Sequence, residues 1–285
     1  MTVIGLVERC AARLDQAGVV FGHGTDNAFD EAAWLVLWSL GLPLDDLDGV
    51  ADASVTPAQQ AAAVDLVERR IATRKPAAYL TGEAWLQGVP FFVDERVIVP
   101  RSLIAEPLAD GTLDAWLSDR TERVLDLCTG NGSLAVLAAM AWPDVVVDGT
   151  DLSADALAVA CRNVKRHGLE DRITLRQGNG LAAAVGAYDL ILCNPPYVNR
   201  DSMAVLPPEY RAEPALALAG GGDGMDFVRP LLAGVAAHLR PQGALVLEIG
   251  HERVHFEATF PHLQPVWLPT SAGDDQVLLL TREDL

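Results

Sequence analysis

Apolar residues recur at helical spacing through the first third of the chain. Three segments have this pattern, residues 2–17, 29–40 and 57–74. The last of them is preceded at residues 56–59 by Thr-Pro-Ala-Gln, a capping box with proline at the first helical position. No strand-like alternation occurs in this region, so residues 1–80 are expected to form a helical domain.

The pattern changes over residues 82–100, where short apolar runs alternate with glycine-containing turns. Residues 84–86, 90–93 and 97–99 are expected to form short strands, because apolar and β-branched side chains are concentrated there. We interpret this stretch as a connector between two larger regions.

Strands alternate with helices from Arg123 onward. Such alternation predicts an α/β fold in which helices cover a parallel sheet. Ser153 can cap the second of these helices, and Gly168 can end it. The expected strands are residues 124–128, 145–150, 173–176, 188–193, 244–249 and 276–280, and the expected helices lie near residues 133–141, 154–167 and 225–239.

Charge narrows the range of partners. The chain of 285 residues is 50% hydrophobic and 21% charged, which is ordinary for a globular protein with a sizeable core. Its net charge of −18 repels phosphate backbones and favours basic partners, so a general nucleic-acid-binding function is disfavoured. The only dense basic cluster is Arg69, Arg70, Arg74 and Lys75, which we interpret as the solvated end of a helix.

Cysteine usage and hydropathy indicate a reducing, aqueous environment. The four cysteines are too dispersed for a disulfide framework or a metal knuckle. The longest apolar run, residues 34–42, is interrupted by Ser39 and Gly41, and no membrane span or secretion signal is expected. These features predict a cytoplasmic protein.

A glycine turn follows the first strand of the α/β region. Gly130 and Gly132 lack a Cβ, so the backbone there can approach a nucleotide-like ligand closely. Asp151 ends the next strand, and a carboxylate at that point can accept hydrogen bonds from both ribose hydroxyls of a cofactor. The turn also satisfies the relaxed dinucleotide fingerprint through Ala135, so a dinucleotide site and a purely structural turn remain alternatives at this point.

Two further features favour S-adenosyl-L-methionine over a dinucleotide. Asp126 lies within the first strand, where its carboxylate can face the ammonium group of that cofactor. A second polar site also follows a later strand, at Asn194. In this interpretation Asp151 holds the ribose.

Residues 189–197, Asp-Leu-Ile-Leu-Cys-Asn-Pro-Pro-Tyr, are the most informative stretch. The buried strand ends at Asn194, and Pro195 and Pro196 fix the backbone that follows in an extended conformation. An amide nitrogen is a poor nucleophile because its lone pair is delocalised. The Asn194 side-chain carbonyl and the Pro195 backbone carbonyl can accept its two hydrogens, while Tyr197 packs on the planar group and aligns it. A turn with an ordinary half-buried tyrosine is the structural alternative.

Together these motifs resemble the HemK family of protein N(5)-glutamine methyltransferases, over almost the whole chain. Further matches lie at residues 76–82, 99–101, 213–218 and 222–224. The resemblance implies a class I S-adenosylmethionine-dependent methyltransferase fold with a Rossmann-like, seven-stranded, mostly parallel sheet. It divides the chain into a helical substrate-recognition domain (1–80), a β-hairpin linker (81–104) and the methyltransferase domain (105–285). It implies cofactor contacts by Asp126, Cys128, Thr129, Gly130, Asn131, Gly132, Asp151, Leu152, Asn179 and Asn194, and an acceptor site at Asn194, Pro195, Pro196 and Tyr197.

The family has two branches that differ in substrate. Residues 92–106 and Cys128 resemble the branch that methylates the third protein of the large ribosomal subunit. The branch that methylates peptide-chain release factors typically has Pro-Arg-Pro-(Asp/Glu)-Thr-Glu in the linker and glycine in place of Cys128. The resemblance therefore implies a basic ribosomal protein as substrate, with a release factor as the alternative. A nucleic-acid adenine-N6 methyltransferase and a non-catalytic cofactor-binding protein are the alternatives of other classes.

His251 and His255 belong to a His-Glu-x-x-His sequence that matches a zinc-binding pattern. Because it follows the buried strand 244–249, we interpret it as the solvated beginning of a helix and expect no metal.

Cysteine and tryptophan also have simple structural interpretations. Cys128 and Cys193 end buried strands, where a thiol packs well. Trp34, Trp38 and Trp85 are expected to fill cores or an interdomain contact, with the first two on one helical face.

Overall fold

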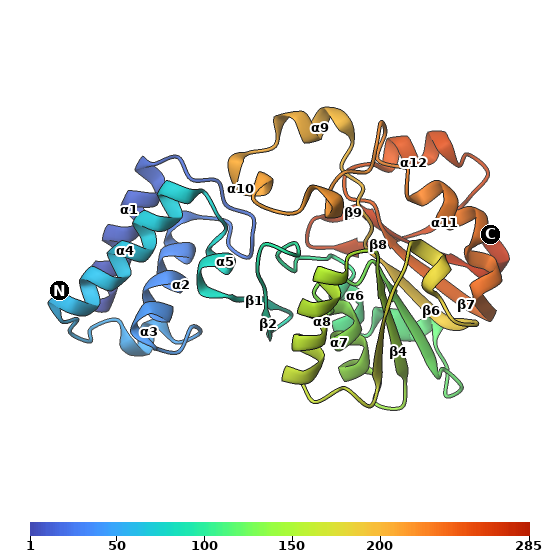
Figure 1. Cartoon of the computed structure of the whole chain (residues 1–285), viewed down its shortest axis with the longest axis horizontal. Helices are drawn as coiled ribbons and strands as arrows, with labels where there is room; N and C mark the ends of the chain where they lie inside the picture. Colours follow the sequence, from blue (N-terminus) through green and yellow to red (C-terminus); the bar gives the residue numbers. More distant parts are fainter.

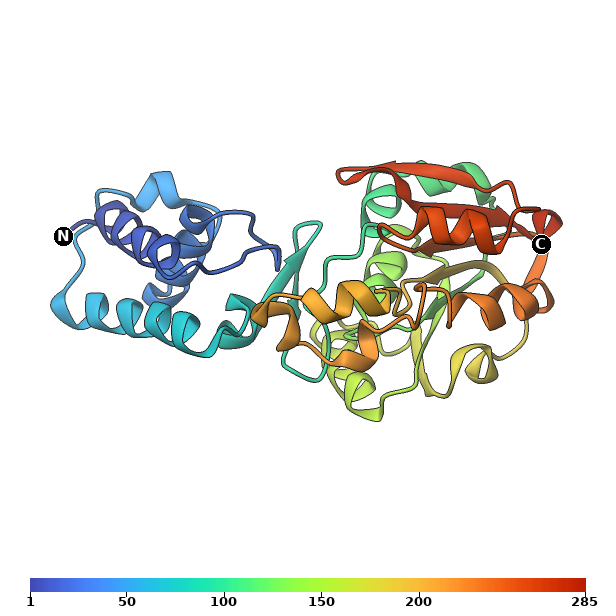
Figure 2. The same ribbon diagram turned by 90° about the horizontal axis from the view of Figure 1, so that it is seen from above.

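The computed structural model describes residues 1–285. A helical part, which contains the N-terminus, lies at one end of an elongated molecule, and an α/β part with the C-terminus lies at the other (Figure 1). A small hairpin connects them (Figure 2). No helix has both the length and the apolar character needed to cross a membrane.

The helical part has its own core, formed where α1 and α4 pack on α2. Local sequence signals set the helix boundaries. The side chains of Thr2 and Asn27 cap α1 and α2, Thr56 and Gln59 form the expected capping box, and Gly41 ends α2 in the left-handed conformation. The three predicted helices are confirmed. The helices are α1 (Val3–Gln16), α2 (Ala28–Leu40), α3 (Leu47–Val50), α4 (Pro57–Thr73) and α5 (Ala77–Thr81).

The connector is a two-stranded antiparallel hairpin of β1 (Glu83–Leu86) and β2 (Val89–Phe92). The strand expected at residues 97–99 is wrong. The Val99 amide donates instead to the Glu213 carboxylate, and the Val97 carbonyl accepts from the Tyr79 hydroxyl. Side chains therefore satisfy the backbone groups that a neighbouring strand would otherwise pair.

The α/β part contains the seven-stranded sheet, with the order β5-β4-β3-β6-β7-β9-β8. All pairs are parallel except those made by β9. Only β8 lacks a counterpart in the sequence prediction, because this edge strand has a single buried residue and contains a proline. The strands are β3 (Arg123–Leu127), β4 (Val146–Asp151), β5 (Ile173–Gln177), β6 (Tyr188–Cys193), β7 (Leu239–Glu248), β8 (Val266–Thr270) and β9 (Gly273–Thr281).

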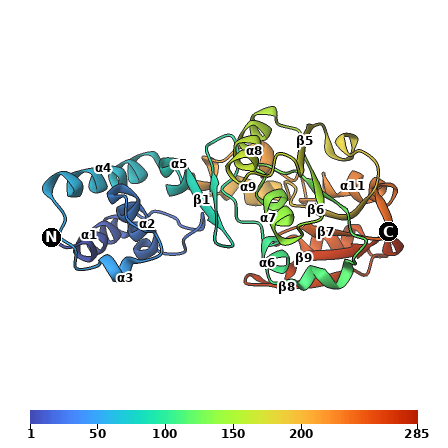
Figure 3. The same cartoon turned by 90° about the horizontal axis from the view of Figure 1, so that it is seen from below.

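Helices cover both faces of the sheet (Figure 3). One apolar core contains α6 (Ala105–Ala109) and α7 (Ser133–Ala141), and α8 (Ala154–Arg166) also packs on this side. The core on the opposite face contains α11 (Val228–Gly234) and α12 (Arg253–Thr259). Ser153 caps α8 as expected. The helix expected near residues 225–239 is shorter, because a 3-10 turn follows α11. Short 3-10 turns complete the chain at Thr112–Trp116, Gly180–Ala183, Ala215–Ala217, Val235–His238 and Arg282–Asp284.

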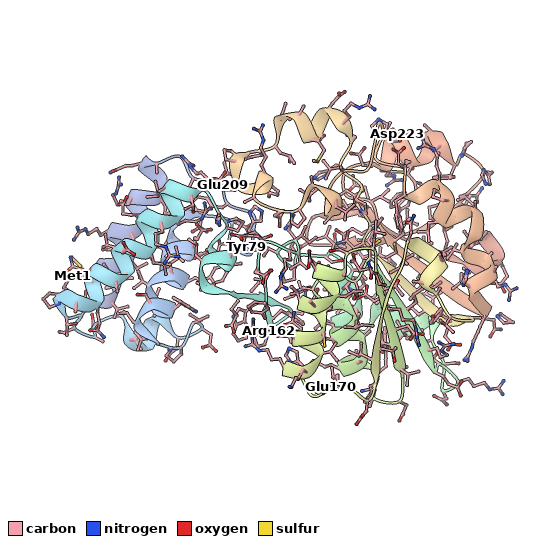
Figure 4. All side chains as sticks on the ribbon, in the orientation of Figure 1. Met1, Tyr79, Arg162, Glu170, Glu209 and Asp223 are labelled. Carbon is pink, nitrogen blue, oxygen red and sulfur yellow. The ribbon has the colours of Figure 1, made fainter.

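The segment after β6 reaches back to the helical part. It contains α9 (Arg200–Val205) and α10 (Pro208–Arg211), and Figure 4 labels Glu209 on α10 where the segment meets that part. Glu209 accepts a hydrogen bond from the Val20 amide at 3.2 Å and from Arg74 Nη1 at 3.1 Å. Arg70 is fully buried, and its Nε lies 2.8 Å from Glu31 Oε1. The interpretation of the basic cluster as a solvated helix end is therefore wrong for Arg70 and Arg74.

The same interface continues toward the hairpin. Glu213 accepts two hydrogen bonds from Arg101, at 2.6 and 2.7 Å, and its Oε2 lies 3.5 Å from His23 Nε2. The Tyr210 ring contacts the His23 ring, with 4.3 Å between the ring centroids, and also lies near the Arg101 guanidinium. We call the set of Glu31, Arg70, Arg74, Glu209, His23, Arg101, Tyr210 and Glu213 the junction.

Candidate functional site

A pocket opens where the carboxyl ends of three central strands meet. Leu127 in β3 is level with Thr150 in β4 and with Cys193 in β6, so the next residues of all three strands emerge at one edge. Ligands bind at this edge in open α/β sheets, next to the point where strand order reverses. Of the predicted site residues, the pocket is lined by Asp126, Cys128, Thr129, Gly130, Asn131, Asp151, Leu152, Asn179, Asn194 and Pro196.

Asp126 is buried below the glycine turn. Its Oδ2 accepts hydrogen bonds from the Thr129 hydroxyl at 2.5 Å and from the Ala135 amide at 3.0 Å, while Oδ1 has no hydrogen-bond partner. Burial raises the pKa of Asp126 to about 7, although these two hydrogen bonds lower it. No arginine or lysine forms an ion pair with this carboxyl group, so it can attract a cationic ligand group.

Asp151 organises the glycine turn as well as facing the pocket. Its Oδ2 accepts from the Gly130 amide at 2.9 Å, and its Oδ1 accepts from the Ser153 amide at 2.8 Å. Burial raises its pKa, against these backbone hydrogen bonds. Each carboxylate oxygen retains acceptor capacity for a ligand hydroxyl, as the sequence interpretation requires.

Gly132 has a different role from the one expected. It does not line the pocket. A Cβ at this position would lie 3.2 Å from the Ala160 side chain, and the residue has a φ of 81°. Gly132 therefore allows α8 to pack closely against the turn and supports the pocket indirectly.

The pocket wall includes two buried donors without partners. These are Nδ2 of Asn131 and Oγ1 of Thr150. Buried polar atoms normally have hydrogen-bond partners, so such atoms point to a ligand with acceptor groups. S-adenosyl-L-methionine fits this wall, because it combines carboxylate and hydroxyl acceptors with the ammonium group that would face Asp126.

Asn194 and Pro196 border the pocket on the β6 side. The half-buried Asn194 side chain makes no hydrogen bond within the protein, so its carbonyl and amide groups are available to a substrate. Pro195 is buried and does not line the pocket.

Tyr197 does not line the pocket either. Its hydroxyl donates to Glu248 Oε1 at 3.0 Å, and its ring lies against the backbone of Gly250. The structure therefore places this ring behind the acceptor motif rather than over the pocket.

Glu248 is a residue that the sequence interpretation missed. Its Oε2 accepts from the Ser102 hydroxyl at 2.6 Å and from the Leu103 amide at 2.9 Å. Its position at the end of the buried β7 was the available signal, since Asp151 and Asn194 occupy similar strand ends. Glu248 thereby fixes the end of the connector next to the Tyr197 hydroxyl.

Other lining residues come from segments outside the strand ends. Arg101 and Ser102 directly follow the connector, and Phe227 precedes α11. Leu152, which is 48% exposed, and Asn179 line the pocket beyond Asp151, as expected. Arg101 and Phe227 were not assigned from the sequence, because nothing local places these segments at the strand ends.

The two histidines of the zinc-like sequence do not share a helix face. The helix α12 begins at Arg253, so His251 lies outside it. Glu252 is buried rather than solvated, and it accepts from the Asn199 side chain at 2.7 Å and pairs with His255. The segment therefore anchors the start of α9.

Comparison with known proteins identifies the family. The model of the methyltransferase small domain matches residues 111–207, and the model of the PrmC N-terminal domain matches residues 6–82. A ribosomal protein uL3 glutamine methyltransferase from Bordetella pertussis is 59% identical over 100% of this chain and 96% of its own length. Its counterpart from Burkholderia pseudomallei is 52% identical over 100% of this chain and 95% of its own length. The chain belongs to this family of protein glutamine methyltransferases.

Solved structures agree with the fold of this glutamine methyltransferase family member. The hMettl16 catalytic domain, solved with an RNA hairpin, has a TM-score of 0.53 at 14% identity, over 79% of this chain and 81% of its own. A methyltransferase from Pyrococcus furiosus has a TM-score of 0.50 at 19% identity, over 75% of this chain and 97% of its own. Family membership makes the protein a methyltransferase whose methyl donor is S-adenosyl-L-methionine.

Proposed function

We propose that this protein transfers a methyl group from S-adenosyl-L-methionine to a glutamine side-chain nitrogen of ribosomal protein uL3. The observation that most directly supports this proposal is that the Asn194 side chain, which makes no hydrogen bond within the protein, borders the same pocket as Asp126 and Asp151. The names of the full-length relatives support uL3 as the substrate.

The cofactor side of the pocket binds by charge and by hydrogen bonds. When bound, S-adenosyl-L-methionine supplies an electrophilic methyl group on a sulfonium centre. Asp126 attracts the ammonium group, Asp151 accepts from the ribose hydroxyls, and Asn131 donates to the carboxylate. The turn at Cys128, Thr129 and Gly130 supplies close backbone contacts, and Leu152 and Asn179 hold the adenine.

The acceptor side holds the glutamine amide. The Asn194 side-chain carbonyl and the Pro195 backbone carbonyl accept the two amide hydrogens, which localises the nitrogen lone pair and stabilises the positive charge that develops. Pro196 keeps this backbone extended. The sequence interpretation had Tyr197 align the planar amide, but its ring does not line the pocket, so we assign it instead to support of the acceptor motif, with its hydroxyl held by Glu248.

The same proposal assigns a role to each region. Residues 1–80 form a domain that recognises the substrate, residues 81–104 the linker, and residues 105–285 the methyltransferase domain. The substrate is a basic protein, since the net charge of −18 favours one, and the reaction takes place in the cytoplasm.

The test offers three acceptors to the purified protein in separate reactions with radiolabelled S-adenosyl-L-methionine. They are uL3, a peptide-chain release factor and adenine-containing nucleic acid. Methylglutamine in uL3, located by mass spectrometry, is the expected result. Label on the release factor would keep the chemistry and change the substrate, whereas label on nucleic acid would replace the proposed chemistry by adenine methylation.

Asn194→Ala tests the acceptor site itself. Removing acceptors that face developing charge typically lowers kcat by about 10²- to 10³-fold, and we expect a loss of this size. Calorimetry should give a near-normal affinity for S-adenosyl-L-methionine, because Asn194 belongs mainly to the acceptor side. Full activity of this variant would refute its assigned role.

A further inference from the structure

A second large cavity lies between the helical part and the hairpin. It forms a groove of about 980 Å³ lined by residues of α2, α3 and β1, and Figure 3 shows the helical part next to the hairpin that contains β1. Val99 borders this groove, whereas Ile98 and Pro100 border the cofactor pocket. The two cavities thus meet at residues 98–100, and a chain bound in the groove lies close to the wall of the pocket that Asn194 also borders.

Exposed aromatic rings line the groove. The exposed fractions are 40% for Trp38, 46% for Trp85 and 41% for Phe29. The expectation that the tryptophans fill cores or an interdomain contact is therefore wrong for Trp38 and Trp85. Trp34 is half-buried and borders the groove together with Trp38, as their shared helical face predicts. Large apolar side chains gathered on a surface mark an interaction site.

The groove is also acidic. Its lining contains the five carboxylates of Asp30, Asp45, Asp46, Asp48 and Glu83, and no lysine or arginine. None of the four aspartates takes part in an ion pair, and Glu83 pairs with Arg166 outside the groove. Carboxylates next to exposed indole rings suit a guanidinium or ammonium group, through charge attraction and cation–π contact.

Two buried polar groups at the groove lack partners. His23, which is 1% exposed, has no hydrogen bond to Nδ1, and the indole nitrogen of Trp34 has no acceptor. Both residues border the groove. A bound polypeptide carries the carbonyl and amide groups that such atoms require.

We propose that this groove docks a segment rich in arginine or lysine of the protein whose glutamine is methylated. This inference rests on the proposed function, because it takes the groove and the acceptor site to serve the same substrate. The meeting of the two cavities at residues 98–100 explains how docking there brings the substrate close to Asn194.

The test compares two charge-reversed variants of the full chain. Asp45→Lys/Asp48→Lys changes two exposed groove residues, and Asp15→Lys/Asp65→Lys makes the same change on exposed parts of α1 and α4 that do not line the groove. Binding of intact uL3 is measured by calorimetry, and its methylation by incorporation of label. Circular dichroism and S-adenosyl-L-methionine affinity verify the folding of each variant.

We expect the groove variant to raise both the Kd and the KM for uL3 by about tenfold or more, with kcat at saturating uL3 preserved. The control variant should stay within about twofold of the wild type. Trp85→Thr, which keeps a strand-forming residue in β1, should weaken binding by about fivefold without a change in net charge. A groove variant that binds uL3 like the control would overturn the docking site.

The two proposals fail in different ways. If the wild type methylates uL3 and the groove variants behave like the control, the docking site is wrong and the function stands. If the wild type binds uL3 through the groove without methylating it, the proposed function is wrong and the docking site stands. If the wild type neither binds nor methylates uL3, both are overturned.

Discussion

Buried and half-buried carboxyl groups occur in two regions of this molecule, and their hydrogen-bond partners differ in charge. In the pocket region, Asp126, Asp151 and Glu248 accept hydrogen bonds only from neutral hydroxyl and amide groups. Burial raises the pKa of all three. No protein cation lies within ion-pair distance of any of them.

The junction carboxyl groups all have cationic partners. Glu31 pairs with Arg70, Glu209 with Arg74, and Glu213 with Arg101. Burial alone would raise the pKa of Glu213, but the contacts with His23 and Arg101 lower it to about 2. The pKa of Glu209 is also lowered, whereas burial outweighs Arg70 at Glu31 and raises that pKa.

The presence or absence of a cationic partner distinguishes acids that hold the fold together from acids that can bind a ligand. A buried carboxyl group with an internal arginine partner holds two parts of the chain together, and losing one partner leaves a costly unpaired charge. A buried carboxyl group without a cation is maintained at a cost to stability, which is typical of functional sites. Asp126 and Asp151, which line the pocket, are thus available to a ligand, and the junction acids fix the segment after β6 against the helical part.

The largest expected effect is the loss of a junction cation. Arg70→Met leaves Glu31 without its only ion-pair partner and should destabilise the protein by about 3–5 kcal/mol. Urea unfolding measures this change. The matched control Arg69→Met alters an exposed neighbour without an ion pair and should cost less than about 0.5 kcal/mol. Equal effects of the two substitutions would contradict a stabilising role of the junction. Unchanged affinity for S-adenosyl-L-methionine in Arg70→Met would show that this role is separate from cofactor binding.

Replacing a pocket acid should stabilise the protein, in contrast to replacing a junction arginine. The folded pKa of Asp126 lies above the ordinary value of 3.8, at about 7, so the folded state favours the protonated form. The destabilisation caused by burying the ionised Asp126 carboxylate is absent below about pH 4. It grows between about pH 4 and 7 and reaches its full size above about pH 7. Asp126→Asn should therefore stabilise the ligand-free protein at pH 8 by about 2–4 kcal/mol.

The control for Asp126→Asn is the same stability measurement at a lower pH. The gain in unfolding free energy should disappear near pH 4, and a gain of the same size at both pH values would contradict the assigned cause. Affinity for S-adenosyl-L-methionine should fall in this variant. In the wild type, affinity should decline as the pH is lowered through 7, because protonated Asp126 no longer attracts the ammonium group.

Asp151→Ala should produce a smaller loss that is confined to the cofactor. Hydrogen bonds to a charged group contribute about 1.5–3 kcal/mol, so calorimetric affinity should decrease by about tenfold to a hundredfold. The loss has two sources, the ribose contact and the hydrogen bond that Asp151 accepts from the Gly130 amide. Asp155→Ala, on the exposed side of α8, is the matched control. Unchanged affinity in Asp151→Ala would exclude it from the cofactor site.

The sequence predicts the pocket far better than the junction, for a physical reason. Asp126, Asp151 and Asn194 each lie at or within one residue of the end of a strand, and parallel strands bring their carboxyl ends to one edge. Pairing of Arg74 with Glu209 joins residues 135 positions apart, and no local pattern encodes it. Arginines near a helix end resemble solvated charges until the partner element is known.

Residues whose role depends on neighbouring side chains were also misjudged. Tyr197 belongs to the acceptor motif, yet its hydroxyl is held by Glu248 from another strand. Trp38 and Trp85 were expected to be buried because tryptophan usually is, but the groove leaves their rings exposed. Strand periodicity identifies which residues end a strand, while tertiary packing decides what each of them contacts.

The smallest expected effect concerns the backbone of the pocket. Cys128 has a φ of 64°, a left-handed conformation that favours glycine, directly after β3. Cys128→Gly relieves this strain and should change stability by no more than about 1 kcal/mol, because glycine also gains freedom in the unfolded chain. Cys161→Gly in the interior of α8 is the control, and it should destabilise by about 1 kcal/mol because its backbone is helical. If Cys128→Gly destabilises as much as the control, the thiol contributes packing that outweighs the strain. If it is neutral or stabilising, the pocket carries backbone strain in addition to its unpaired charges.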